Sequence, residues 1–221
     1  QATAGNISIA AAGGTITLDS GGSPANVVRA VGTGTISIDA NGASSDILVN
    51  DGISSASGDI TLTADNDVIF AAEGDIVSTS GNVAVTADAD NGGATSGALT
   101  MNDGTLINAG SGTISLGADE NIALGGLLTT NTSATAVTLT STEGGITDAG
   151  DAVVDVVTAS GTLVIDAVTG VDIDTTVGSL DLDNATSGNV AIAETNDITV
   201  AKAVQATAGN ISIAAAGGTI T

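Results

Sequence analysis

The chain lacks cysteine, histidine, tryptophan and tyrosine, and its 221 residues include one proline, one methionine and one phenylalanine. Without cysteine, a disulfide framework is excluded. A compact domain of this length normally fills its core with aromatic residues, Met and Leu, which bury the most area. Here the 42% hydrophobic content is almost entirely Ala, Val, Ile and Leu. Such small side chains favour a narrow core that extends along an axis, with Phe70 and Met101 filling single gaps.

Basic residues are almost absent as well. Arg29 and Lys202 stand against 25 acidic residues, which gives a formal net charge of −23. Such a surface repels nucleic acids and anionic lipid headgroups, so we expect neither as a partner. No apolar run approaches the length of a membrane span, so we expect no membrane insertion. The mean hydropathy of +0.41 and the dense Ile/Val alternation indicate a folded chain, not a disordered one.

A long repeat is visible at the two ends of the sequence. Residues 1–17 and residues 205–221 both read QATAGNISIAAAGGTIT, which gives a period of 204 residues. We therefore predict a single continuous segment over residues 1–221. It would comprise one complete repeat, residues 1–204, and the start of the next, residues 205–221.

A shorter period divides this repeat. The pattern Gly-x-[Ile/Val/Leu]-x-[Ile/Val/Leu] recurs with modest variation, and it predicts eight coils of about 25 residues, a length typical of solenoids. The matching segments are GNISI at 5, GTISI at 34, GDITL at 58, GNVAV at 81, GTISL at 112, TAVTL at 135, GTLVI at 161 and GNVAI at 188, before GNISI returns at 209.

Aligning the eight coils predicts three inward columns, because alternate residues of a strand face the same side. The first column is Ile7, Ile36, Ile60, Val83, Ile114, Val137, Leu163 and Val190. The second is Ile9, Ile38, Leu62, Val85, Leu116, Leu139, Ile165 and Ile192. The third is Ala11, Ala40, Ala64, Ala87, Ala118, Ser141, Ala167 and Glu194. Glu194 breaks the third column, so we predict that it points outward. For the opening glycine, which is present in seven of the eight coils, we predict a turn with positive φ.

Each coil also contains two further strand-like segments, such as TITL (15–18) and NVVRAV (26–31), or DVIF (67–70) and DIVSTS (75–80). Three strands separated by polar turns predict a triangular cross-section, with parallel pairing between coils and right-handed winding. The predicted fold is thus an all-β, right-handed parallel β-helix of about eight three-strand coils per repeat. With strands about 4.7–4.9 Å apart, one repeat would advance roughly 38 Å.

The run G-x-[ILV]-x-[ILV]-x-A, as in GTISIDA (34–40) and GDITLTA (58–64), resembles the shaft of filamentous haemagglutinin-type bacterial adhesins. The resemblance is one of pattern and composition over the whole chain. It implies a giant secreted protein with a β-helical shaft, located outside the cell or on its surface, that attaches to cells or surfaces.

Three other functions are weighed against this interpretation. A carbohydrate-active β-helix enzyme would need a tuned proton carrier, and the chain offers two basic residues and no aromatic platform for a sugar. Calcium could bind oxygen-rich turns, either Asp88, Asp90 and Asn91 or Asp181, Asp183 and Asn184, although Asp and Asn in turns usually bond to backbone. Ice binding would need regular outward threonines, whereas the TIT (15–17) and TLT (61–63 and 138–140) segments recur irregularly.

We therefore predict a structural and adhesive protein that is not an enzyme and has no catalytic, cofactor-binding or metal-binding residues and no cofactor. The expected partners are further identical repeats stacked end to end, and components of a cell surface or matrix. The alternative is a self-assembling extracellular filament without its own receptor. Because nothing in the sequence looks like a cap, we expect the native chain to continue through further repeats and an isolated segment to stack head to tail.

Overall fold

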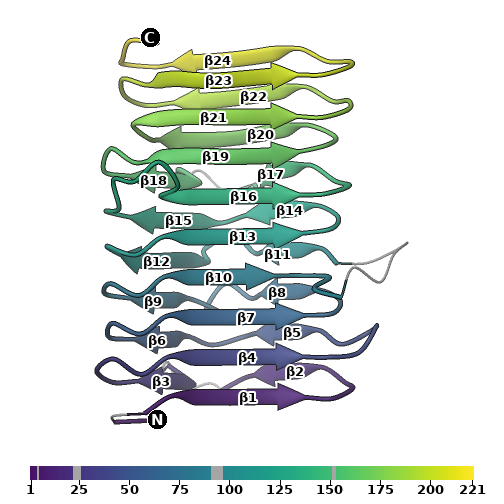
Figure 1. The fold of residues 1–221 in the computed structure, drawn as a ribbon, viewed down its shortest axis with the longest axis vertical. Helices are drawn as coiled ribbons and strands as arrows, with labels where there is room; N and C mark the ends of the chain where they lie inside the picture. Colours follow the sequence, from purple (N-terminus) through teal and green to yellow (C-terminus); the bar gives the residue numbers. More distant parts are fainter. Residues whose placement is uncertain (4, 22–25, 91–96, 151–152) are drawn as a thin grey trace.

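Short runs in which apolar and small polar residues alternate form strands with every second side chain buried, as in β4 (Ile36–Ala40) and β7 (Ile60–Ala64). The computed structural model describes residues 1–3, 5–21, 26–90, 97–150 and 153–221. In it the strands stack in parallel into an elongated β-helix with the two termini at opposite ends (Figure 1). As the chain rises in Figure 1, near strands run to the right and far strands to the left, which is right-handed winding. The predicted right-handed parallel β-helix is confirmed.

Two sheets enclose the core. The near sheet of Figure 1 contains, in order, β1 (Ile7–Ala11), β4, β7, β10 (Val83–Thr86), β13 (Ile114–Ala118), β16 (Val137–Ser141), β19 (Thr162–Ala167), β21 (Ser179–Asn184) and β23 (Thr199–Gln205). The far sheet has two columns. The first is β2 (Ile16–Leu18), β5 (Ile47–Val49), β8 (Val68–Phe70), β11 (Leu99–Met101), β14 (Ile122–Leu124) and β17 (Ile146–Asp148). The second is β3 (Val28–Ala30), β6 (Ile53–Ser55), β9 (Ile76–Ser78), β12 (Leu106–Gly110), β15 (Gly126–Thr129) and β18 (Val156–Thr158).

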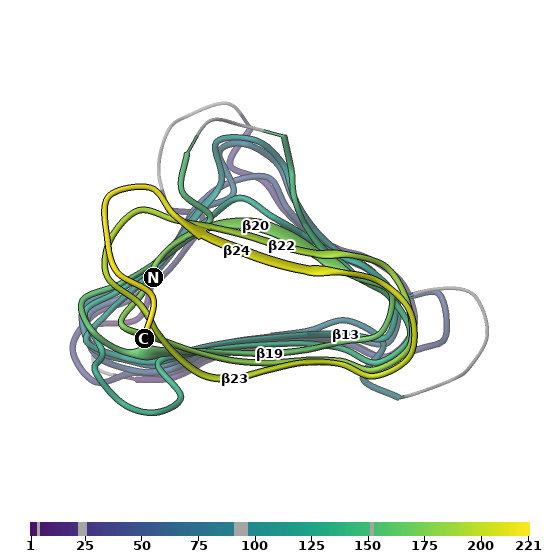
Figure 2. The ribbon, with the colours of Figure 1, turned by 90° about the horizontal axis from the view of Figure 1, so that it is seen from above.

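The two far columns meet at β20 (Val171–Thr176). Its first residues pair with β17 and its last with β18, so one straight strand replaces two. β22 (Val190–Glu194) and β24 (Ile211–Ala215) then stack on β20. In Figure 2 the coils of β20, β22 and β24 cross the body directly, whereas earlier coils bulge outward at a third corner. The cross-section therefore changes from triangular to flat along the shaft.

This change corrects the predicted number of strands per coil, while the number of coils per repeat stays near the predicted eight. The first six coils have three strands each, as expected, but the last three, β19–β20, β21–β22 and β23–β24, have two. The loss of the third strand has a local cause. β20 continues without a turn through the position of the third corner, and the Val177–Gly178 segment then leads directly back to the near sheet.

The inward columns are confirmed through Leu163 and Ile165, whose register partners in β16 are Val137 and Leu139. The next residues in the columns are not the predicted ones. Leu163 pairs with Leu180, Ile165 with Leu182 and Ala167 with Asn184. The predicted members Val190, Ile192 and Glu194 lie instead in the far sheet, beside Val171, Ile173 and Thr175.

The core is one continuous cluster of Ile, Val, Leu and Ala that runs along the shaft. Its two bulky members, Phe70 and Met101, are fully buried and stack on each other in adjacent coils. Their inward placement was expected from the sequence.

The positive φ predicted for the opening glycines is confirmed at Gly188, where φ is 85°, but not at most of the others. Gly34, Gly58 and Gly81 are not among the residues with positive φ. A Cβ on Gly58 would lie 2.0 Å from the carbonyl oxygen of Gly34, and one on Gly81 would lie 2.1 Å from that of Gly58. These glycines are required because consecutive backbones approach too closely for any side chain.

The two copies of the repeated segment occupy different sheets. β1, from residues 1–17, lies in the near sheet, whereas β24, from residues 205–221, lies in the far sheet. Identical sequence is therefore accommodated on either side of the shaft.

Candidate functional site: the stacked turns and the outer faces

Many of the Asp and Asn residues clamp one coil to the next. Each stands directly before an inward apolar residue, and its side-chain oxygen accepts a hydrogen bond from a backbone N–H in the coil above, at 2.7–3.3 Å. The residues are Asn6, Asp46, Asp59, Asp67, Asp75, Asn82, Asn121, Asn189 and Asp197. The sequence signal was present in the second position of GNISI, GDITL and GNVAV, where the side chain is Asn or Asp. These residues therefore have a structural role in coil stacking.

Buried hydroxyls perform a related task at the corners. Ser55 and Ser78 Oγ accept hydrogen bonds from Gly58 and Gly81 N–H at 3.0 and 2.9 Å. Thr129 Oγ1 donates to the carbonyl oxygen of Gly112 at 2.6 Å. Ser141 Oγ, in the predicted alanine column, donates to the carbonyl oxygen of Glu120 at 2.6 Å. A hydroxyl at these positions satisfies turn backbone that would otherwise be buried without a partner.

The prediction that Glu194 points outward is wrong. Its side chain is fully buried. One oxygen accepts a hydrogen bond from Thr175 Oγ1 at 2.8 Å, and both are close to Val177 N–H, at 3.2 and 3.3 Å. Backbone N–H groups of Thr195 and Asn196 also donate to it, at 3.0 and 3.2 Å. The carboxylate thus ties the β22 coil to the β20 coil at the corner where the chain turns back to the near sheet.

Asn184 takes the place in the near-sheet column that Glu194 was expected to break. It is fully buried, and its Oδ1 accepts a hydrogen bond from Gly170 N–H at 3.1 Å. Its Nδ2 donates to the carbonyl oxygen of Ser187 at 2.8 Å and to Gln205 Oε1 at 2.7 Å. Asn184 and Glu194 are therefore both inward and hydrogen-bonded, as buried polar groups must be.

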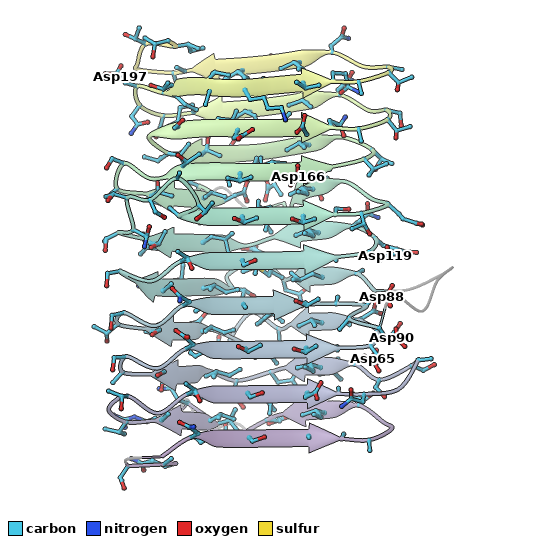
Figure 3. All side chains as sticks on the ribbon, in the orientation of Figure 1. Asp65, Asp88, Asp90, Asp119, Asp166 and Asp197 are labelled. Atoms are coloured by element: carbon cyan, nitrogen blue, oxygen red, sulfur yellow. The ribbon has the colours of Figure 1, made fainter. Side chains whose placement is uncertain are left out.

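In the two oxygen-rich segments considered for calcium, the described side chains do not converge as a ligand set. Asp181 and Asp183 are partly exposed on the outer face of β21, whereas Asn184 faces the core. Asp88 and Asp90 lie near the edge formed by the turns after the near-sheet strands, where Figure 3 also labels Asp65 and Asp119. Asn91 lies outside the described residues. Across the part of the chain that the structure describes, no three Asp or Glu side chains converge as metal ligands would.

The two basic residues lie at opposite ends of the shaft. Lys202 on β23 forms an ion pair with Asp183 on the outer face. The hydrogen bond to Asp183 raises the pKa of the Lys202 ammonium above its ordinary value, with smaller contributions in the same direction from Asp181 and Asp166. Arg29 on β3 borders a shallow depression of about 280 Å³ whose described lining residues include no carboxylate. That depression therefore offers no acid–base pair for hydrolysis.

The threonine pairs considered for ice binding do not form one array. Thr61 and Thr138 lie on the near sheet, with Ala84 and Ser115 between them, whereas Thr17 lies on the far sheet beside Leu48. The outer face of the near sheet is therefore flat and rich in small hydroxyl side chains, but it is chemically irregular.

No protein-family model, curated protein or solved structure matches this chain. Among the described residues, no helix is long and apolar enough to cross a membrane.

Proposed function

We propose that this chain is part of the structural shaft of an extracellular bacterial adhesin or surface fibre that mediates attachment to cells or surfaces. The observation that supports this most is the way the side chains are used. Apolar residues form one uninterrupted core along the axis, and the Asp, Asn, Ser and Thr residues of the turns bond to neighbouring coils. Among the described residues, the polar side chains of the turns therefore serve mainly to hold stacked coils together, as a long shaft requires.

The outer surface fits the same proposal. Its carboxylates keep a long fibre soluble and disfavour nucleic acids and anionic membranes as partners. The preferred partners are further repeats of the same sequence, stacked along the axis, and components of a cell surface or matrix.

The proposal is tested with antibodies raised against the purified chain and applied to intact source cells. We expect gold label on extended structures outside the cell envelope, and we expect deletion of the gene to reduce attachment to a surface. Label confined to the cytoplasm would contradict the proposal. Label in extracellular fibres with unchanged attachment would favour the second candidate, a self-assembling filament without its own receptor.

The second candidate, a self-assembling filament, requires separate shafts to pair through their end strands. In the described structure, the outer edges of β1 and β24 have no strand beside them, and Ile211 and Ile220 at the upper end are 37% and 46% exposed. Such edges pair readily with another strand.

We therefore expect the purified chain to associate head to tail, because a heterologous contact that does not close on itself propagates. Analytical sedimentation at micromolar concentration measures this. The variant Ile213→Lys places a charge at a half-buried core position of the last strand. It should reduce this association. A monodisperse, folded monomer of the unmodified chain would contradict the expectation.

A further inference from the structure

The repeated segment changes sides within one period. Ile7–Ala11 pairs with β4 in the near sheet, and the identical Ile211–Ala215 pairs with β22 in the far sheet. The next element moves too. Ile16 of the first copy lies in the far sheet, whereas Ile220 of the second bridges to Ile198, directly before the near-sheet strand β23. Two consecutive elements of the repeat have therefore exchanged sheets.

The flat coils cause this exchange. If every coil had three strands, β22 would lie on β19 and the second copy would return to the near sheet. Because each of the last coils has two strands, β21 lies on β19 instead, and β22 and β24 fall on the far side. The repeat then ends half a turn out of phase with its own beginning.

The buried polar residues favour this arrangement over the regular one. Glu194 reaches its donors Thr175 Oγ1 and Val177 N–H only because β22 lies beside β20. If Val190 lay beside Leu163, Glu194 would follow Ala167 in the near-sheet column, away from both donors. In that register Glu194 would keep only the N–H groups of its own neighbours Thr195 and Asn196. Losing the other donors destabilises a buried carboxylate, so Glu194 favours the two-strand coils.

We infer that each 204-residue repeat adds a non-integral number of turns, so that consecutive repeats begin on opposite sides of the shaft. This inference rests on the proposed continuation of the shaft through further repeats. Such repeats are related by a rotation about the axis as well as by a translation along it.

The rotation determines what a partner meets along the shaft. In the first six coils, the outer face of the near sheet presents mainly Ser, Thr, Ala and Gly, and in the last three it presents Asp166, Asp181, Asp183 and Lys202. The next hydroxyl-rich stretch begins on the far side. A partner that lies along one side, including a parallel shaft, therefore meets a surface of mainly small, uncharged side chains only within a single repeat, and contacts are distributed around the fibre.

Cysteine pairs on outward positions distinguish the two arrangements. Val164 and Asp181 are register partners on adjacent near-sheet strands, whereas Ala191 lies on the far sheet. A disulfide requires Cα atoms within about 7 Å. The variants V164C/D181C and V164C/A191C are made in a protein with two consecutive repeats, so that the junction is covered by following coils. T138C/V164C, which joins β16 and β19, is the positive control.

Mild oxidation is expected to form the disulfide of V164C/D181C and that of the control in most molecules, and that of V164C/A191C in none. Mass spectrometry detects the disulfides. Closure of V164C/A191C without V164C/D181C would overturn the inference, because β22 would then lie on β19 and each repeat would begin on the same side. That result would leave the shaft proposal standing, since a straight β-helix of eight coils is also a shaft. Failure of all three pairs, including the control, would contradict the β-helical register and the shaft proposal with it.

Discussion

Replacing Ile60 with Asp is expected to lower the free energy of unfolding by about 3–5 kcal/mol, as expected for an unpaired charge in a protein interior. Ile60 is fully buried, and its register partners in the coils below and above are Ile36 and Val83. Nothing in this column can donate a hydrogen bond to a carboxylate. The loss is measured by chemical denaturation followed by circular dichroism.

The matched control is the adjacent residue on the same strand. Thr61 is exposed on the outer face of β7, so Thr61→Asp introduces the same carboxylate on the solvent side and should cost about 1 kcal/mol or less. If the two variants unfold at the same denaturant concentration, the assignment of inward and outward positions in the near sheet is wrong.

Replacing Glu194 with Ala is expected to cost about 3 kcal/mol. The change removes the acceptor for Thr175 Oγ1 and for the fully buried Val177 N–H, and each buried donor left without a partner costs about 1–3 kcal/mol. Glu194→Gln should cost less than Glu194→Ala, because it keeps one oxygen acceptor. It should still cost stability, because its NH2 group would face backbone N–H groups that now donate to the carboxylate. Thermal and denaturant unfolding of the two variants measure the order.

Glu143 provides the control for this second prediction. It is an exposed glutamate in the turn after β16, so Glu143→Ala should change stability by no more than about 0.5 kcal/mol. Equal effects at Glu143 and Glu194 would mean that Glu194 is not an internal tie between coils.

Periodicity alone predicted most of the fold, because each stacked coil needs the same kinds of residue at the same positions. Ile, Val or Leu must recur wherever a strand faces the narrow core, so the columns through Leu163 and Ile165 could be aligned from sequence. The three strands of the early coils followed from polar turns at regular intervals, and β2, β3, β8 and β9 formed within the segments expected.

The prediction failed where the pattern is degenerate. Val190 and Ile192 fit an inward column of either sheet, because both sheets place β-branched or other aliphatic residues against the core. Only Glu194 and Asn184 distinguish the two sheets. Their preference depends on hydrogen-bond donors in other coils, namely Thr175, Val177 and Gly170, whose positions in space cannot be read from a sequence alignment. The opening glycines were recognised as necessary, but at Gly58 and Gly81 the reason is close contact with the backbone of the previous opening glycine, which is a property of stacking and not of the local turn.

The candidate functional surface was less predictable than the fold. The sequence left calcium open at two oxygen-rich segments, although Asp and Asn in turns were expected to bond mainly to backbone. The bonds of Asp59, Asp67 and Asp75 are to backbone, but in the coil above, which the sequence did not predict. The exchange of the repeated segment between sheets leaves no trace in the segment itself, since residues 1–17 and 205–221 are identical.

The length added by each repeat tests most directly whether this chain forms an extendable shaft. The near sheet rises through nine strands from β1 to β23, and the second copy of the repeat begins about half a turn later. With about 4.8 Å between strands, each repeat should lengthen the shaft by roughly 41 Å. Electron micrographs of purified proteins with two, three and four consecutive repeats measure this increment. Particles that grow by about 40 Å per repeat at constant width are the expected result, and an increment near 20 or 60 Å, or growth in width, would contradict the account.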